Sequence, residues 1–254
     1  MKNIFWIMIF SIGLSISSYG QEKISIRVAE FAPFYFKDKN GNWQGLDVEL
    51  AKVVIEKAGF NVEYFELPWS RALKHLETGK LDILMNVSMT DERKNKMNFI
   101  GPERYGQMGL LVKIENKDWD IKTFESLETI SIEKNKKFGI QNGVFYGEEF
   151  NNKLKDPNYS KYFVETFSAE KNIVLLNNNK ILGFFEDKLY LNYLIKTDII
   201  YQRTVLHSFD GFPKEPIYFA ISKKMSKDNY TKLKQVFDLL EKDGTLDKIR
   251  KKYE

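Results

Sequence analysis

The stretch from Leu81 to Pro102, LDILMNVSMTDERKNKMNFIGP, constrains the fold of this chain more than any other. It begins with a nearly continuous apolar run, Leu81 to Met85, which follows Gly79. Such a short apolar run is typical of a parallel strand that is covered on both faces. Polar residues follow at once, at the carboxyl end of the strand, where open α/β sheets bind their ligands. The stretch therefore predicts an α/β fold with a binding site at this strand end.

The polar residues that follow the strand could form an anion site. Thr90 can cap a new helix, and Asp91 and Glu92 favour its first turn. Arg93 lies on that turn, so its guanidinium would lie near the Ser88 hydroxyl and free backbone N–H groups. A planar guanidinium with such donors suits a carboxylate. The alternative is that Arg93 pairs with Glu92 or Asp91 on a solvated helix face, and the pattern alone leaves both open.

Segments typical of strands and helices alternate on both sides of this stretch. We expect strands at 24–29, 62–65, 81–85, 108–113, 138–141, 162–166, 181–185, 199–205 and 216–222, and helices at 45–59, 70–78, 144–154, 169–176, 187–195, 227–241 and 246–253. Alternation of this kind predicts parallel sheets covered by helices. The chain therefore reads as two α/β halves, with a passage between them near 104–109.

Composition and motifs exclude several classes of function. The 254 residues carry a formal net charge of +4 with acids and bases interleaved, so nucleic acid is not an expected partner. There is no cysteine, which excludes disulfides, and the two histidines have no metal-ligand spacing. No nucleophile-elbow, P-loop or dinucleotide-binding motif occurs. We expect neither a metal nor a cofactor, and no catalytic set.

Residues 1–20 have the pattern of a cleaved signal peptide. Lys2 precedes an apolar run from Ile4 to Ile16, and Ser18 and Gly20 are the small residues that a signal peptidase reads. We expect cleavage after Gly20 and export to the periplasm without lipid, because no cysteine is present to carry it. The alternative is an uncleaved anchor, although the run is shorter than a typical membrane span.

Three further segments complete a recognisable pattern. RVAEFAPFYFKDKNGNWQGLDVELA lies near the start, PWSRALKHLETGKLD precedes the strand, and KDGTLDKIRKKY lies at the end. Together with S-x-T-x-E-R and F-x-x-P in the first stretch, they make the chain after residue 22 resemble the family 3 periplasmic solute-binding proteins of ABC transporters. This family is the polar amino-acid-binding type.

The resemblance implies a type II periplasmic-binding-protein fold. Each of its two lobes has a mainly parallel sheet flanked by helices, and two crossing strands form the hinge. Residues 21–106 and 211–254 would form the first lobe, and residues 107–210 the second. The ligand would lie in the cleft between them, and the lobes would close on it.

Carried over to this sequence, the resemblance implies a set of ligand-binding residues. Arg93 and Ser88 occupy the positions that hold the ligand carboxylate, and Asp187 occupies that of the acid that holds its ammonium. Trp69 and Phe31 match two positions of aromatic rings against the ligand. The rest of the predicted set is Asn86, Glu30, Val144 and Phe145.

Each of these assignments has an alternative. Trp69 and Phe31 could belong to the core, Asp187 could cap the following helix, and Glu186 could face the ligand in its place. Val144 and Phe145 depart from the family, which usually has hydroxyl residues here. Only amides at a helix N-terminus would remain in this chain to grip a carboxylate.

The resemblance implies a non-enzymatic binding protein. We expect a monomer that captures an amino acid or related carboxylate and delivers it to an inner-membrane ABC permease. One alternative is a dehydratase-like enzyme on the same scaffold, with Glu186 or Asp187 acting on a bound carboxylic acid. Another is a sensor partner that presents its ligand to a receptor.

Overall fold

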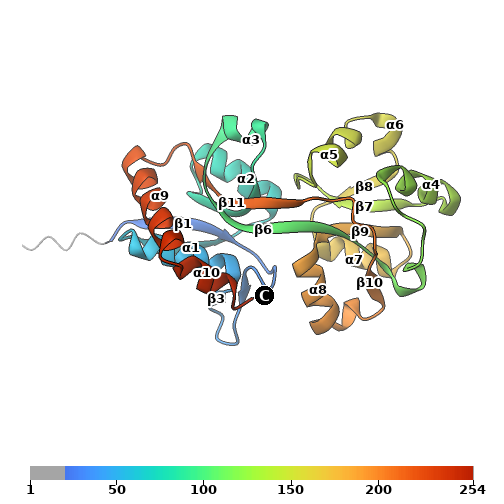
Figure 1. Cartoon of the computed structure of the whole chain (residues 1–254), viewed down its shortest axis with the longest axis horizontal. Coiled ribbons are helices and arrows are strands. Elements are labelled where there is room, and N and C mark those ends of the chain that lie inside the picture. The colour runs from blue at the N-terminus through green and yellow to red at the C-terminus, as the bar shows by residue number, and fades with distance from the viewer. Residues whose placement is uncertain (1–20, 254) are drawn as a thin grey trace, which may run out of the picture.

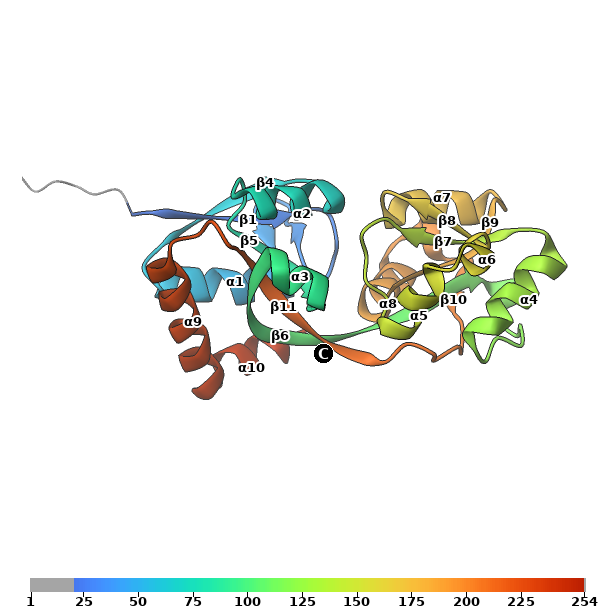
Figure 2. The ribbon, with the colours of Figure 1, turned by 90° about the horizontal axis from the view of Figure 1, so that it is seen from above.

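Two lobes lie side by side in the computed structural model, which describes residues 21–253 (Figure 1). Each lobe is a sheet flanked by helices, and two strands pass between the lobes along one side (Figure 2). The predicted two-lobed α/β fold is confirmed. The predicted signal peptide lies outside the described residues. None of the helices in residues 21–253 is long and apolar enough to cross a membrane.

The first lobe is built from both ends of the described chain. Its sheet pairs β1 in parallel with β4 and with β5. Its elements are β1 (Lys23–Val28), the hairpin β2 (Phe36–Lys37) and β3 (Trp43–Gln44), α1 (Leu46–Lys57), β4 (Asn61–Glu66), α2 (Trp69–Thr78), β5 (Ile83–Ser88), α3 (Asp91–Lys96), α9 (Lys227–Lys242) and α10 (Thr245–Arg250). On α1, Leu46, Leu50 and Val54 are buried along one face, as their helical spacing predicts.

The crossing strands are β6 (Met97–Lys113) and β11 (Lys214–Ser222). They pair antiparallel from Lys214↔Gln107 to Ser222↔Met97 and place the sheets of both lobes on one path, in the order β4–β1–β5–β11–β6–β9–β7–β8. The sequence predicted only 108–113 of β6. Gly101, whose φ of +134° suits glycine alone, and Pro102 interrupt the apolar alternation by which a strand is recognised.

The second lobe repeats the parallel pattern, with β7 between β8 and β9. Its elements are the short 3₁₀ turn η1 (Ile114–Asn116), α4 (Phe124–Lys134), β7 (Lys137–Gln141), α5 (Glu148–Leu154), α6 (Pro157–Ser160), β8 (Phe163–Thr166), α7 (Ala169–Asn177), β9 (Ile181–Asp187), α8 (Lys188–Thr197), the 3₁₀ turn η2 (Ile199–Tyr201) and β10 (Thr204–Leu206).

Two predicted elements of this lobe differ from the structure, a helix in where it begins and a strand in its type. The helix expected at 144–154 begins only at Glu148, because Gly143 and Gly147 have positive φ and hold the segment between them in a loop. The strand expected at 199–205 is instead η2 followed by the short β10. Asp198 accepts the N–H of Ile200 and turns the chain there.

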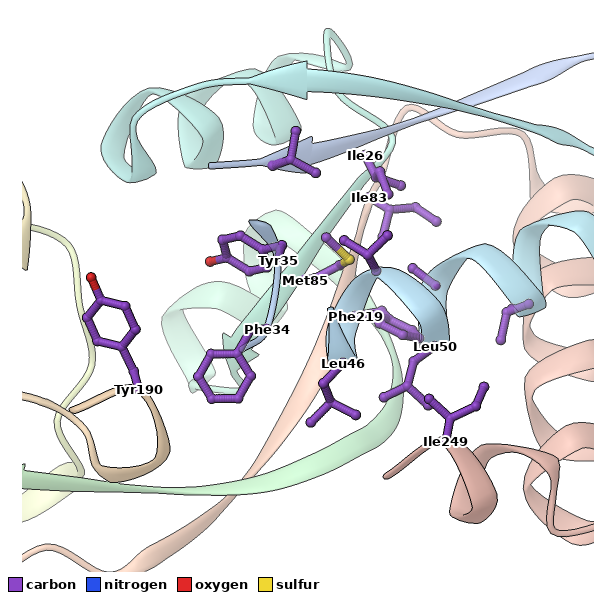
Figure 3. Close-up of a cluster of buried hydrophobic side chains, with 14 of the residues drawn as sticks. Ile26, Phe34, Tyr35, Leu46, Leu50, Ile83, Met85, Tyr190, Phe219 and Ile249 are labelled. Atoms are coloured by element: carbon purple, nitrogen blue, oxygen red, sulfur yellow. The ribbon is translucent and has the colours of Figure 1, made fainter. Parts of the chain in front are cut away.

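The cores of the two lobes touch. Phe184 and Phe185 are neighbours on β9 and face opposite sides of the sheet, since side chains alternate along a strand. Phe184 packs in the same cluster as Tyr190 of α8, and that cluster also contains Phe34 and Tyr35 of the first lobe. Figure 3 shows Tyr190 on the second-lobe side, opposite Phe34 and Tyr35 of the first lobe. Apolar packing therefore crosses between the lobes as well as filling each of them.

Candidate ligand-binding cleft

A cavity of about 680 Å³ lies between the lobes. Its walls come from the carboxyl ends of parallel strands, where α/β sheets place their sites, and from the crossing strands. All of the ligand-binding residues predicted from sequence line it: Glu30, Phe31, Trp69, Asn86, Ser88, Arg93, Val144, Phe145 and Asp187. The structure thus brings residues 157 positions apart in sequence, Glu30 and Asp187, to one cavity.

Both the backbone and the guanidinium of Arg93 are held by hydrogen bonds. Its backbone N–H donates to the side chain of Thr90, which caps α3 as predicted. Its Nη1 donates to the carbonyl of Ser88 at 2.9 Å, and its Nη2 donates to the carbonyl of Gly143 in the second lobe, also at 2.9 Å. Burial lowers the pKa of the guanidinium to about 10, which still leaves it charged at neutral pH.

The acids next to Arg93 have other partners. Asp91 pairs with Lys94 at 3.0 Å, and Glu92 pairs with Lys96 at 2.7 Å. The alternative in which Arg93 pairs with one of these acids on a solvated face is therefore wrong. Its guanidinium lines the cleft instead.

Two aromatic residues form part of the cleft wall. The indole N–H of Trp69 donates to the carbonyl of Gly143 at 3.1 Å, the same oxygen that Arg93 contacts. The ring of Phe31 stacks on that of Tyr190 from the second lobe, with 4.1 Å between ring centroids. Both rings therefore serve the packing between the lobes and also face the cavity.

Asp187 caps a helix and also lies at the cleft. Its Oδ1 accepts the N–H groups of Leu189 and Tyr190, so it caps α8. Its Oδ2 accepts Nη1 of Arg104 at 3.4 Å, and the residue also lines the cavity. Glu186 lines the cavity too, so the structure places both acids at the cleft.

Arg104 on β6 is the centre of a buried polar cluster that joins the lobes. Its Nε donates to Asp47 of α1 at 3.0 Å and its Nη2 to Asn86 at 2.6 Å, and Nη1 reaches Asp187. The guanidinium lies 3.8 Å from the centroid of the Phe34 ring. Burial alone would lower its pKa, but the carboxylates around it outweigh that effect and raise it.

Glu103 on β6 is a buried acid next to Arg104. It is fully buried, its Oε1 accepts the N–H of Asn86 at 2.7 Å, and its Oε2 has no hydrogen-bond partner. Burial, followed by the charge of Asp47, raises its pKa well above the usual range. Both causes disfavour a negative charge on Glu103 beside Asp47.

The helix N-terminus that was expected to present amides at residue 144 is not there. Residues 144–147 form a loop before α5, in which the N–H of Val144 donates to the carbonyl of Gln141 at 3.3 Å. The N–H of Tyr146 donates to the side chain of Asn151 at 2.7 Å. Val144 and Phe145 line the cavity from this loop and not from a helix N-terminus.

Several cleft residues had no distinguishing sequence signal. Arg27 is buried on β1, donating to the carbonyl of Leu67 at 2.9 Å and to the Tyr35 hydroxyl at 2.6 Å. It reads as one polar residue between Ile26 and Val28, the pattern of an ordinary strand. Phe167 lines the cavity with 80% of its surface exposed. Within residues 21–253, no three His, Asp or Glu side chains are grouped so that they could hold a metal ion.

Comparison with known proteins identifies the family of this chain. The model of the bacterial extracellular solute-binding proteins, family 3, matches residues 24–254. The chain belongs to this family. A protein of Bacillus subtilis (strain 168), described as a probable amino-acid-binding protein, is 31% identical to this family member over 228 residues, which are 87% of this chain and 79% of that protein.

Two solved structures show the same fold at moderate identity. An ancestral arginine-binding protein bound to arginine matches with a TM-score of 0.76 and 26% identity, covering 92% of this chain and 98% of that one. An ancestral amino acid-binding protein, described as a precursor of cyclohexadienyl dehydratase, matches with a TM-score of 0.72 and 28% identity, covering 91% and 95%.

Proposed function

We propose that this family 3 protein binds an amino acid or a closely related carboxylate in its cleft and delivers it to an ABC-type permease. The observation that carries the proposal is the charged Arg93, held at the cavity wall by Ser88 and Gly143. A guanidinium in a sheltered cleft is suited to a carboxylate because it can form two parallel hydrogen bonds. The relatives described above as amino-acid-binding proteins support the same ligand class.

The remaining cleft residues have complementary roles in the proposal. Ser88 assists Arg93 with the carboxylate, and Asp187 holds the ammonium group. Trp69 and Phe31 pack against the ligand, which adds apolar contact and, for a cation, attraction to the ring face. Asn86, Glu30, Val144 and Phe145 complete the wall.

The lobes are proposed to move as the units 21–106 with 211–254 and 107–210, hinged at the crossing strands. Export to the periplasm with cleavage after Gly20 fits the family's extracellular setting. The protein would act there as a monomer. N-terminal sequencing of periplasmic material should begin at Gln21, and membrane-bound material that begins at Met1 would contradict this.

A thermal-shift screen over amino acids, organic acids and amines tests the ligand class. A ligand at about 100 times its Kd should stabilise the folded protein by about 2.7 kcal/mol. If no amino acid or related carboxylate in the screen shifts the melting temperature at millimolar concentration, the proposal is wrong.

One observation favours a second function. Glu186 is a buried carboxyl in the cleft whose raised pKa keeps it protonated near neutral pH, as a general acid must be. The likeness to an ancestor described as a dehydratase precursor fits this reading. Incubation of each stabilising ligand with the protein, followed by mass spectrometry, separates the two functions. Unchanged ligand supports binding alone, whereas loss of water from it would show an enzyme.

A further inference from the structure

Glu186 is a carboxyl group without a cation beside it. It is the next-to-last residue of β9, lines the cavity, and is only 5% exposed. Its Oε1 accepts the N–H of Asp187 at 3.0 Å. In the described part of the chain, no lysine or arginine forms an ion pair with it. Arg104 on β6 contacts the neighbouring Asp187 instead.

The titratable groups around Glu186 are all acidic or phenolic. They are Asp187 on β9, Glu170 on α7, Tyr146 before α5, Tyr190 on α8 and Tyr201 on η2. Burial is the main cause of the shift, and the charges of Asp187 and Glu170 add to it, so the pKa of Glu186 rises to about 8. At neutral pH this carboxyl therefore carries a proton in most molecules.

The cavity lining as a whole has more acidic than basic residues. Its lining contains the cations Arg27 and Arg93 and the acids Glu30, Glu66, Glu170, Glu186, Asp187 and Glu215. Two of the acids are neutralised, Glu66 by Lys37 at 2.8 Å and Asp187 by Arg104. The N–H groups of Arg27 and Arg93 named above donate to uncharged oxygens, so they neutralise none of the other acids. This surplus favours a ligand that brings positive charge beyond its own ammonium group.

We propose, on the basis of the proposed function, that Glu186 selects amino acids with a positively charged side chain and releases its proton to solvent when one binds. The ligand's carboxylate would contact Arg93 in the first lobe and its side-chain cation would contact Glu186 in the second. The O–H bond of the carboxyl breaks, the proton goes to the buffer, and the carboxylate that remains pairs with the cation. A neutral side chain leaves Glu186 protonated, since nothing then stabilises the charged form.

Proton release predicts the direction in which affinity changes with pH. Because binding of a cationic ligand removes a proton from the protein, its affinity must rise with pH up to about pH 8. For one proton released, the rise is at most about tenfold per pH unit. The affinity of a neutral amino acid should not follow this dependence.

Titration calorimetry of L-arginine and L-glutamine at pH 7 tests the proposal. Titrations in phosphate and in Tris count protons, because the two buffers take up a proton with different heats. L-Arginine should release close to one proton per molecule bound, and L-glutamine none. Glu186→Gln should abolish the proton release and weaken the binding of L-arginine by about tenfold to a hundredfold. The affinity for L-glutamine should change little.

The control variant is Glu133→Gln, which changes an exposed acid on α4 that does not line the cavity. It should keep the proton release and both affinities. The proton count is made on the unaltered protein, so it does not depend on how well a variant folds. Binding of L-arginine with equal heats in both buffers would overturn the role of Glu186 and leave the proposed function intact. Failure of every amino acid and related carboxylate to bind would overturn both.

Discussion

Arg93 donates to two backbone carbonyls that belong to different lobes, Ser88 and Gly143. The contact with Ser88 orients the guanidinium from its own lobe, and the contact with Gly143 depends on how close the second lobe lies. The guanidinium can therefore respond to a ligand and to the position of the opposite lobe at once.

Replacing Arg93 should therefore damage binding far more than folding. Arg93→Ala would leave a ligand carboxylate unpaired in the cleft, which costs about 2–5 kcal/mol, or roughly 30-fold to several thousand-fold in affinity. Arg93→Lys should also bind weakly, because an ammonium cannot form the paired contacts. Titration calorimetry with the best ligand of the screen measures the effect. Lys94→Ala, one position along the same helix, is the control, and unaltered affinity in Arg93→Ala would mean that the carboxylate lies elsewhere.

Glu186 should make the protein less stable as the pH rises. Its folded-state pKa of about 8 lies above the usual 4.5, so between these values the folded state holds a proton that the unfolded state has lost. The free energy of unfolding then falls through this window, by up to about 1.4 kcal/mol per pH unit, and levels off above about pH 8. Glu186→Gln lacks this contribution. In urea titrations from about pH 5 to about pH 8, the free energy of unfolding of the variant should rise relative to that of the unaltered protein. If the two free energies keep a constant difference across this range, the prediction is wrong.

Arg104 should matter for folding because it neutralises buried acids. Asp47 is fully buried and would keep no cation if Arg104 were removed. Arg104→Ala should therefore cost about 3–5 kcal/mol of unfolding free energy, measured in urea. Lys234→Ala breaks an exposed pair with Asp238 and should cost less than about 1 kcal/mol. Equal losses in the two variants would show that burial does not distinguish these pairs.

At the scale of elements, the short helix α3 positions Arg93. Thr90 caps it by accepting the N–H of Arg93 at 3.2 Å, and the helix leads directly into β6. Thr90→Ala should cost about 0.5–2 kcal/mol of stability and weaken ligand binding, because Arg93 loses one of its anchors. Thr90→Ser keeps the hydroxyl and should restore both. Urea titration and calorimetry of the two variants give the answer, and a Ser variant as impaired as the Ala variant would exclude the cap.

The loop at 143–147 shows why element boundaries need more than local pattern. Residues 144–154 contain enough helix-compatible residues to suggest one long helix, but glycines at both ends of the loop take positive φ. The loop changes which backbone groups are available, because it presents the carbonyl of Gly143 to Trp69 and Arg93. A helix N-terminus would have presented N–H groups to the cleft.

At the scale of the whole molecule, β6 and β11 are the covalent links between the lobes in residues 21–253, and the contacts across the cleft come from side chains. Such an arrangement allows hinge closure, in which a few residues absorb the change. We expect small-angle scattering to show a smaller radius of gyration when the ligand of the screen is added. An unchanged scattering profile at saturation would contradict closure.

The sequence by itself determined the features that depend on neighbouring residues. The apolar run before Asn86, the Thr90 cap and the guanidinium of Arg93 lie within a few positions of one another, so local preference decides them. Helical spacing in α1 and α2, and the order of strands and helices, follow from the same short-range rules. The resemblance of ordered segments then predicted nine ligand-binding residues, all of which line one cavity.

Only the tertiary structure decided what depends on distant residues. Arg104 meets Asp47 and Asp187 across separations of 57 and 83 residues, and nothing in its own segment marks it. The raised pKa of Glu186 results from burial, which exists only once β9 is packed between its neighbours. Register, burial and charge pairing arise from contacts that chain folding creates, so local pattern and family resemblance could predict residues that line the cleft but not how its charges are balanced.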